Sequence, residues 1–235
     1  MACPHCLRGK SQNKDISLDI IQKLFDYTEG INSLTITGGE PSIAIDKIDM
    51  LIDEITKRNT PLYNIYCVTN GKANIEEFIL RMLKLYTITI KNGGDTECNG
   101  VALSRDKFHE PIPYENELML QGLSFFTKDK FTDFDKTGYL IPAGNAKNII
   151  GEGYKSYDHR SYIGKSKPEI LIYEDTISVQ DTILVTVNGD ILQDCDYAYD
   201  EIDRFKIGHV NHMDDLIKYF ESIADAQWPN EERSA

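Results

Sequence analysis

The sequence predicts an α/β protein built on a parallel sheet, and two features carry this prediction. Short β-branched runs alternate with amphipathic helical segments in the first half of the chain, and turn residues separate them. This alternation is typical of right-handed crossovers, which place strands side by side in one sheet, either open or curled into a barrel. With 235 residues, the chain is long enough to bury a large core and to fold without disulfide bonds or structural metal ions.

The elements of the first half follow in a regular order. A helix is expected between Ser17, which can cap its start, and Gly30, which can end it. Strands are expected with the sequences SLTIT (33–37), LYNIYCV (62–68) and GVALS (100–104). Amphipathic patterns predict one helix over 45–55 and another that begins at Ile75. The TITI run at 87–90 could extend that helix or form a short strand.

The second half is expected to change in character. A helix from Tyr114 to Phe126 and a strand over 138–142 would complete two more strand–helix units. Residues 144–168 are rich in Gly, Lys, Tyr and Ser and indicate a surface loop. From Glu169 onward the pattern favours short strands, with a hairpin turn at Asn188-Gly189 and a closing helix marked by Met213, Leu216, Ile217 and Phe220.

Composition excludes several functional classes. The formal net charge is -13, so most of the surface would repel a phosphate backbone, and we expect no nucleic-acid partner. No apolar run is long enough to span a membrane, and the N-terminus has no apolar signal segment, so we expect no membrane partner and a cytoplasmic location. The five cysteines are then thiols or metal ligands, and the expected substrate is a small molecule or a peptide.

Two cysteines near the N-terminus are the first chemical signal. Cys3 and Cys6 place two thiols close enough to bind one metal or cluster. A thioredoxin-type dithiol lies after a strand and at the start of a helix, whereas here no strand precedes the pair and about ten polar residues separate it from the first expected helix. Zinc requires four ligands, and no second Cys-x2-Cys or spaced histidine pair accompanies the motif.

With the later turn motifs, this cysteine pair resembles the radical S-adenosylmethionine (radical SAM) superfamily. The family signature is a Cys-x3-Cys-x2-Cys loop after the first strand of a partial α/β barrel. Cys3 and Cys6 match its second and third cysteines, and His5 stands where the family usually has an aromatic residue. The ends of the second to fifth barrel strands are similar to Thr37-Gly38-Gly39-Glu40-Pro41, Thr69-Asn70-Gly71, LSRDKFHE (103–110) and IPAGNAKN (141–148).

The resemblance implies a fold, a cofactor set and a site. The fold would be a partial (βα)6 TIM-like barrel that lacks its first strand (residues 1–168), followed by a β-rich part and terminal helix (169–235). A 4Fe-4S cluster on Cys3 and Cys6 would cleave S-adenosylmethionine (SAM) reductively, with electrons from a flavodoxin or ferredoxin, and the resulting radical would abstract a substrate hydrogen. The residues implied to contact SAM or to line its site are His5, Gly38, Gly39, Glu40, Asn70, Ser104 and Asp106.

The chain departs from the family pattern at its start. The first cysteine of the signature would lie upstream of Met1, so we expect Met1 to be an internal methionine of a longer reading frame. A different class of function stays open beside the enzyme, namely a cluster-free module that binds SAM or a peptide. An oxidoreductase that uses the cysteines as a dithiol is a third hypothesis.

Overall fold

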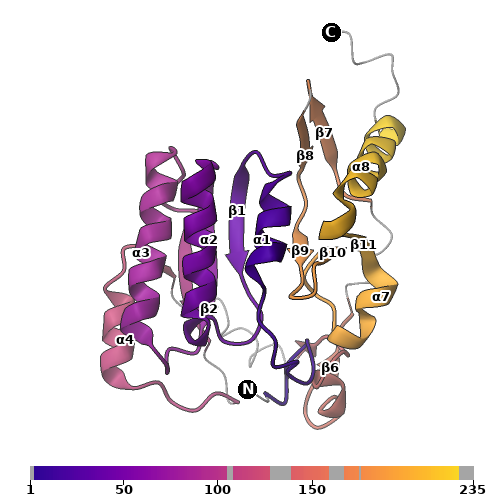
Figure 1. The fold of residues 1–235 in the computed structure, drawn as a ribbon. Coiled ribbons are helices and arrows are strands. Elements are labelled where there is room, and N and C mark those ends of the chain that lie inside the picture. Colours follow the sequence, from indigo (N-terminus) through magenta and orange to yellow (C-terminus); the bar gives the residue numbers. More distant parts are fainter. Residues whose placement is uncertain (1–2, 105–107, 128–138, 159–166, 175, 228–235) are drawn as a thin grey trace. The chain divides into compact units, whose positions relative to one another are not determined.

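The structure is a computed structural model that describes residues 3–104, 108–127, 139–158, 167–174 and 176–227 (Figure 1). The chain forms two compact units. Residues 1–4 and 11–139 belong to the first unit, and residues 5–10 and 140–235 to the second. The domain boundary expected after residue 168 stays a prediction.

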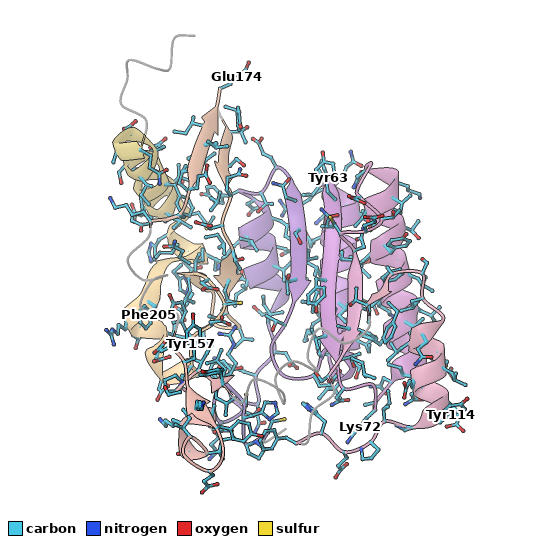
Figure 2. All side chains as sticks on the ribbon, turned by 180° about the vertical axis from the view of Figure 1, so that it is seen from behind. Tyr63, Lys72, Tyr114, Tyr157, Glu174 and Phe205 are labelled. Carbon is cyan, nitrogen blue, oxygen red and sulfur yellow. The ribbon has the colours of Figure 1, made fainter. Side chains whose placement is uncertain are left out.

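A parallel four-stranded sheet is the centre of the first unit, as the sequence predicted. Its strands, in sheet order, are β1 (Ile31–Ile36), β2 (Leu62–Thr69), β3 (Gly100–Leu103) and β4 (Phe126–Thr127). All neighbouring pairs are parallel, so the strands end at one common edge. In Figure 2, the labelled Tyr63 lies at the start of β2 and Lys72 lies beyond its end, at this edge.

Helices cover one face of this sheet (Figures 1 and 2). They are α1 (Leu18–Phe25), α2 (Ile45–Arg58) and α3 (Ile75–Lys91), with α4 (Tyr114–Gln121) beside α3. The fully buried side chains of Phe78, Met82 and Leu85 belong to the same core as Ile65 and the other inward residues of the strands. The TITI run forms the last turns of α3, which decides between the two alternatives left open for it.

The buried carboxylate of Glu54 in α2 links this helix to α1 through Gln22. Glu54 is 4% exposed, and its carboxylate accepts hydrogen bonds from Gln22 Nε2 and Arg58 Nε, both at 3.0 Å. The hydrogen bonds from Gln22 and from Arg58 lower the pKa of Glu54 below its ordinary value. The carboxylate is therefore held in its charged form inside the helical layer.

Two expectations for the middle of the chain were wrong. The helix that begins at Tyr114 ends at Gln121 rather than at Phe126, because Gly122 closes it and the aromatic run that follows enters the sheet as β4. The strand expected over 138–142 is the short β5 (Tyr139–Leu140), which pairs with β6 (Lys155–Ser156) and does not join the parallel sheet. The fold of the described residues is thus mixed α/β, with four strands in the parallel sheet.

The second unit is rich in antiparallel strands, as expected. A hairpin joins β7 (Ile170–Tyr173) to β8 (Thr176–Val179), and a separate sheet has the order β11 (Lys206–His209), β10 (Asp190–Gln193), β9 (Ile183–Val185). The predicted turn at Asn188-Gly189 connects β9 to β10, and Gly189 adopts a φ of 86° that favours glycine. The helices among the described residues of this unit are α7 (Ile202–Phe205) and α8 (Met213–Gln227), with 3-10 turns η2 (Ala146–Asn148), η3 (Tyr199–Glu201) and η4 (Val210–His212).

The short segment 5–10 near the N-terminus packs within this second unit. The Cys6 carbonyl accepts a hydrogen bond from Asn145 N at 2.9 Å. Arg8 is held twice, because its guanidinium donates to the Tyr197 carbonyl at 2.7 Å and its own carbonyl accepts from Tyr199 N at 3.1 Å. A β-carbon at Gly144 would lie 2.1 Å from the Leu7 carbonyl oxygen, so only glycine fits against this segment. Residues far apart in sequence therefore fix the backbone around Cys6.

Candidate functional site

A small cavity lies at the edge of the parallel sheet where β1, β2 and β3 end. Its volume is about 140 Å³. It is lined by Thr35, Ile36, Thr37, Gly38, Gly39, Glu40, Pro41, Val68 and Ser104. Ligands of parallel α/β sheets bind beyond the carboxyl ends of the strands, which makes this cavity the candidate site of the first unit.

Glu40 closes one side of the cavity and joins the ends of two strands. The side chain is 7% exposed, and its Oε1 accepts hydrogen bonds from Thr69 Oγ1 at 2.5 Å and from Ser42 N at 3.2 Å. Its Oε2 accepts from Asn70 N at 2.8 Å. A carboxylate offers roughly four acceptor positions, so these three bonds leave about one position for a ligand. Glu40 thus caps the η1 turn (Pro41–Ile43) and also ties β1 to β2.

The two glycines before Glu40 leave the cavity open. Gly38 has a φ of 139°, in the region that favours glycine, and a β-carbon at either Gly38 or Gly39 would meet no atom within 4 Å. Their backbone is therefore accessible on the side where a side chain would stand. This arrangement allows a ligand to approach the peptide groups closely.

Of the other residues expected at the sheet edge, Ser104 and Asn70 lie there and make different contacts. Ser104 lines the cavity, and its N–H donates to the Thr69 carbonyl at 2.8 Å. Asn70 adjoins Glu40 through its N–H, while its side-chain oxygen accepts from Lys72 N at 3.0 Å and thereby shapes the turn. Asp106 lies outside the described residues.

Sequence reasoning missed the most tightly bound residue of the site. Thr69 is fully buried, donates to Glu40 and accepts from Gly71 N at 3.0 Å. The sequence motif marks Thr69 only as the end of a strand, and the signal for such a bond is a threonine at the carboxyl end of a buried parallel strand. The neighbouring Cys67 is buried in β2, and its pKa is raised by burial and by the charge of Glu40.

The expected metal ligands are divided between the two units. Cys3 belongs to the first unit and Cys6 to the second, and so does His5, which was expected at the SAM site. All three are half-buried. Within the described residues, no group of three or more His, Cys, Asp or Glu side chains could hold a metal ion. The thiols of Cys3 and Cys6 suit an iron–sulfur cluster chemically, but the described residues do not complete its ligand set.

Comparison with known proteins gave no match: no family model, no curated protein and no solved structure matches this chain. Across the described part of the chain, the structure has no helix long and apolar enough to cross a membrane. The assignment of function therefore depends on the motifs and on the geometry at the sheet edge.

Proposed function

We propose that this chain is the core of a radical SAM enzyme and that the cavity at the sheet edge binds the methionine part of SAM. The observation that carries the proposal is the buried Glu40 carboxylate beside two open glycines, at the carboxyl end of β1. This is the position that the family resemblance assigns to the amino-acid end of SAM. The proposal also takes the parallel sheet as part of a partial barrel.

The chemistry of the cavity suits an α-amino group. The ammonium of SAM donates to the acceptor position that remains on Glu40 and to nearby oxygen atoms, and a hydrogen bond to a charged group is worth about 1.5–3 kcal/mol. Small-molecule pockets usually measure about 300–1,000 Å³. A cavity of about 140 Å³ therefore accommodates only part of SAM, and the adenosine part extends beyond it.

The two cysteines have a separate role in the proposal. Cys3 and Cys6 are two of the thiolate ligands of a 4Fe-4S cluster, which when bound supplies the electron that cleaves SAM. The backbone of Cys6 is held by the hydrogen bond from Asn145 N, and the neighbouring Arg8 is held by Tyr197 and Tyr199. The partners of such an enzyme are a flavodoxin or ferredoxin as electron donor and a small molecule or peptide as substrate.

Anaerobic reconstitution with iron and sulfide tests the proposal. Bound iron and sulfide are measured for the unaltered chain, for the double variant Cys3→Ser and Cys6→Ser, and for Cys98→Ser as a control at an exposed cysteine. We expect the double variant to lose the bound iron and the control to retain it. Iron binding that does not depend on Cys3 and Cys6 would contradict the proposal.

The same samples separate the enzyme from the cluster-free alternative. SAM binding is measured by calorimetry with and without iron. Binding that requires reconstitution supports the enzyme. Equal binding by iron-free protein, unchanged in the double cysteine variant, would instead assign the chain to the class of cluster-free SAM-binding modules.

A further inference from the structure

The outer face of α3 carries a regular apolar stripe. Leu80, Leu83 and Ile90 are 51%, 40% and 41% exposed, although helices that cover a sheet normally present polar residues to water. Together with the exposed Glu76 and Thr87, these three residues are spaced alternately four and three positions apart, in the order Glu76, Leu80, Leu83, Thr87 and Ile90. This spacing keeps the side chains on one line along the helix, as in the contact line of paired helices.

Exposed aliphatic residues are concentrated on this part of the first unit. The large aliphatic side chains exposed in the described residues are Leu18, Ile43, Leu80, Leu83, Ile90 and Leu118. Four of these six lie on α3 and on α4, which packs beside it. Single exposed leucines are common on protein surfaces, but such a grouping marks an interaction surface.

The charge on α3 favours contact with another copy of the same chain. The whole chain has a formal net charge of -13, so most faces of two copies repel each other. The charged side chains of α3 are Glu76, Glu77, Arg81, Lys84 and Lys91, and Arg81 already pairs with Glu77 and with Asp49 of α2, so this part of the surface is close to neutral. This helix is therefore one of the places where like-charge repulsion is weakest.

The order of these charges along α3 specifies the orientation. Both acidic residues lie in the first turn of the helix, and Lys91 lies in the last turn. In an antiparallel pair related by a two-fold axis, Glu76 of one copy lies beside Lys91 of the other, whereas Glu77 pairs with Arg81 of its own helix, and each apolar stripe faces its equivalent. A parallel pair would instead place like charges side by side.

We propose that this chain forms a symmetric homodimer in which α3 pairs in antiparallel orientation with α3 of a second copy. A helix of 17 residues is about 25 Å long, so the pair buries less surface than the roughly 1,600 Å² of a standard stable interface. The dimer is accordingly weak and reversible. The inference is independent of the proposed enzymatic function.

Sedimentation equilibrium across the micromolar range tests the dimer. The variants Leu80→Glu and Leu83→Glu place a charge in the stripe, and we expect each to weaken dimerisation by at least about tenfold. Leu18→Glu is the matched control, because Leu18 is an exposed aliphatic residue at the start of α1. Circular dichroism verifies that all three variants are folded.

Charge reversal tests the orientation. Lys91→Glu alone should weaken the dimer, and adding Glu76→Lys to the same chain should restore it, because every contact in a two-fold interface occurs twice. A chain that stays monomeric at all concentrations would overturn the proposal, as would a dimer that tolerates glutamate at both Leu80 and Leu83. A dimer that is lost in the leucine variants but is not restored by the double charge reversal would overturn the antiparallel arrangement.

Discussion

Replacing Thr69 with valine should destabilise the first unit, because the Thr69 hydroxyl links the ends of β1 and β2. This hydroxyl donates to Glu40 Oε1 at 2.5 Å and accepts from Gly71 N at 3.0 Å. Valine has nearly the same shape as threonine but makes neither bond. The packing around a fully buried position is thus preserved while its polar contacts are removed.

The cost can be worked out from these two bonds. Loss of the hydrogen bond to the carboxylate costs about 1.5–3 kcal/mol, and a buried Gly71 N–H without an acceptor costs about 1–3 kcal/mol. Local relaxation recovers part of this sum, so we expect a loss of about 2–4 kcal/mol. Domains of this kind have about 5–15 kcal/mol of stability in total, so the effect is large.

Urea unfolding followed by circular dichroism measures the loss, with Thr69→Ser as the matched control. Serine keeps the hydroxyl and lacks one methyl group, which is worth about 1 kcal/mol. The account requires valine to be clearly more destabilising than serine. Equal losses, or a valine variant as stable as the unaltered chain, would refute the role given to the Thr69 hydroxyl.

Three further predictions concern other parts of the chain. Gly144→Ala should destabilise the protein by about 1–3 kcal/mol more than Gly151→Ala in urea unfolding. Both positions have positive φ, but only at Gly144 do backbone atoms occupy the place of the new methyl group. Equal losses in the two variants would argue against close packing of the segment 5–10. Glu54→Gln should make the free energy of unfolding less dependent on pH in the acid range. The lowered pKa of Glu54 gives stability that is present above the ordinary value of 4.5 and is lost as the pH falls through the folded value. An unchanged pH dependence in denaturation titrations would contradict this. At mildly alkaline pH, Cys195 should react with iodoacetamide more slowly than the exposed Cys98. The reason is that burial and neighbouring carboxylates raise the pKa of Cys195 to about 11. Equal labelling rates of the two cysteines, measured by mass spectrometry, would disprove the raised pKa.

The parallel sheet could be predicted because its signals are local. The strands at 33–37, 62–68 and 100–104 are short β-branched runs that turn residues separate from amphipathic helical segments, a pattern that favours parallel strands. The end of α4 was harder to predict, since the apolar pattern continues through Phe126 while the chain has already turned into β4. The pairing of β5 with β6 depends on contacts between segments that are separated in the sequence, which no local pattern reports.

The site was predictable only in part. Parallel strands bring their carboxyl ends together, so Gly38, Gly39, Glu40 and Ser104 were expected at one edge, where they line one cavity. The bond from Thr69 to Glu40 depends on the register between β1 and β2, which the sequence does not specify. In the same way, hydrophobic periodicity identified the buried face of α3 but not the second apolar line on its outer face.

SAM binding by the anaerobically reconstituted chain, compared with its Glu40→Gln variant, tests the central claim most directly. Calorimetry is carried out under conditions where circular dichroism shows both proteins to be folded, because Glu40 also stabilises the sheet edge. The account predicts that the unaltered chain binds SAM and that the variant binds it at least about tenfold more weakly, since the carboxylate no longer pairs with the ammonium. Equal affinity in the two folded proteins, or no binding by the reconstituted chain, would contradict the assignment of this cavity to SAM.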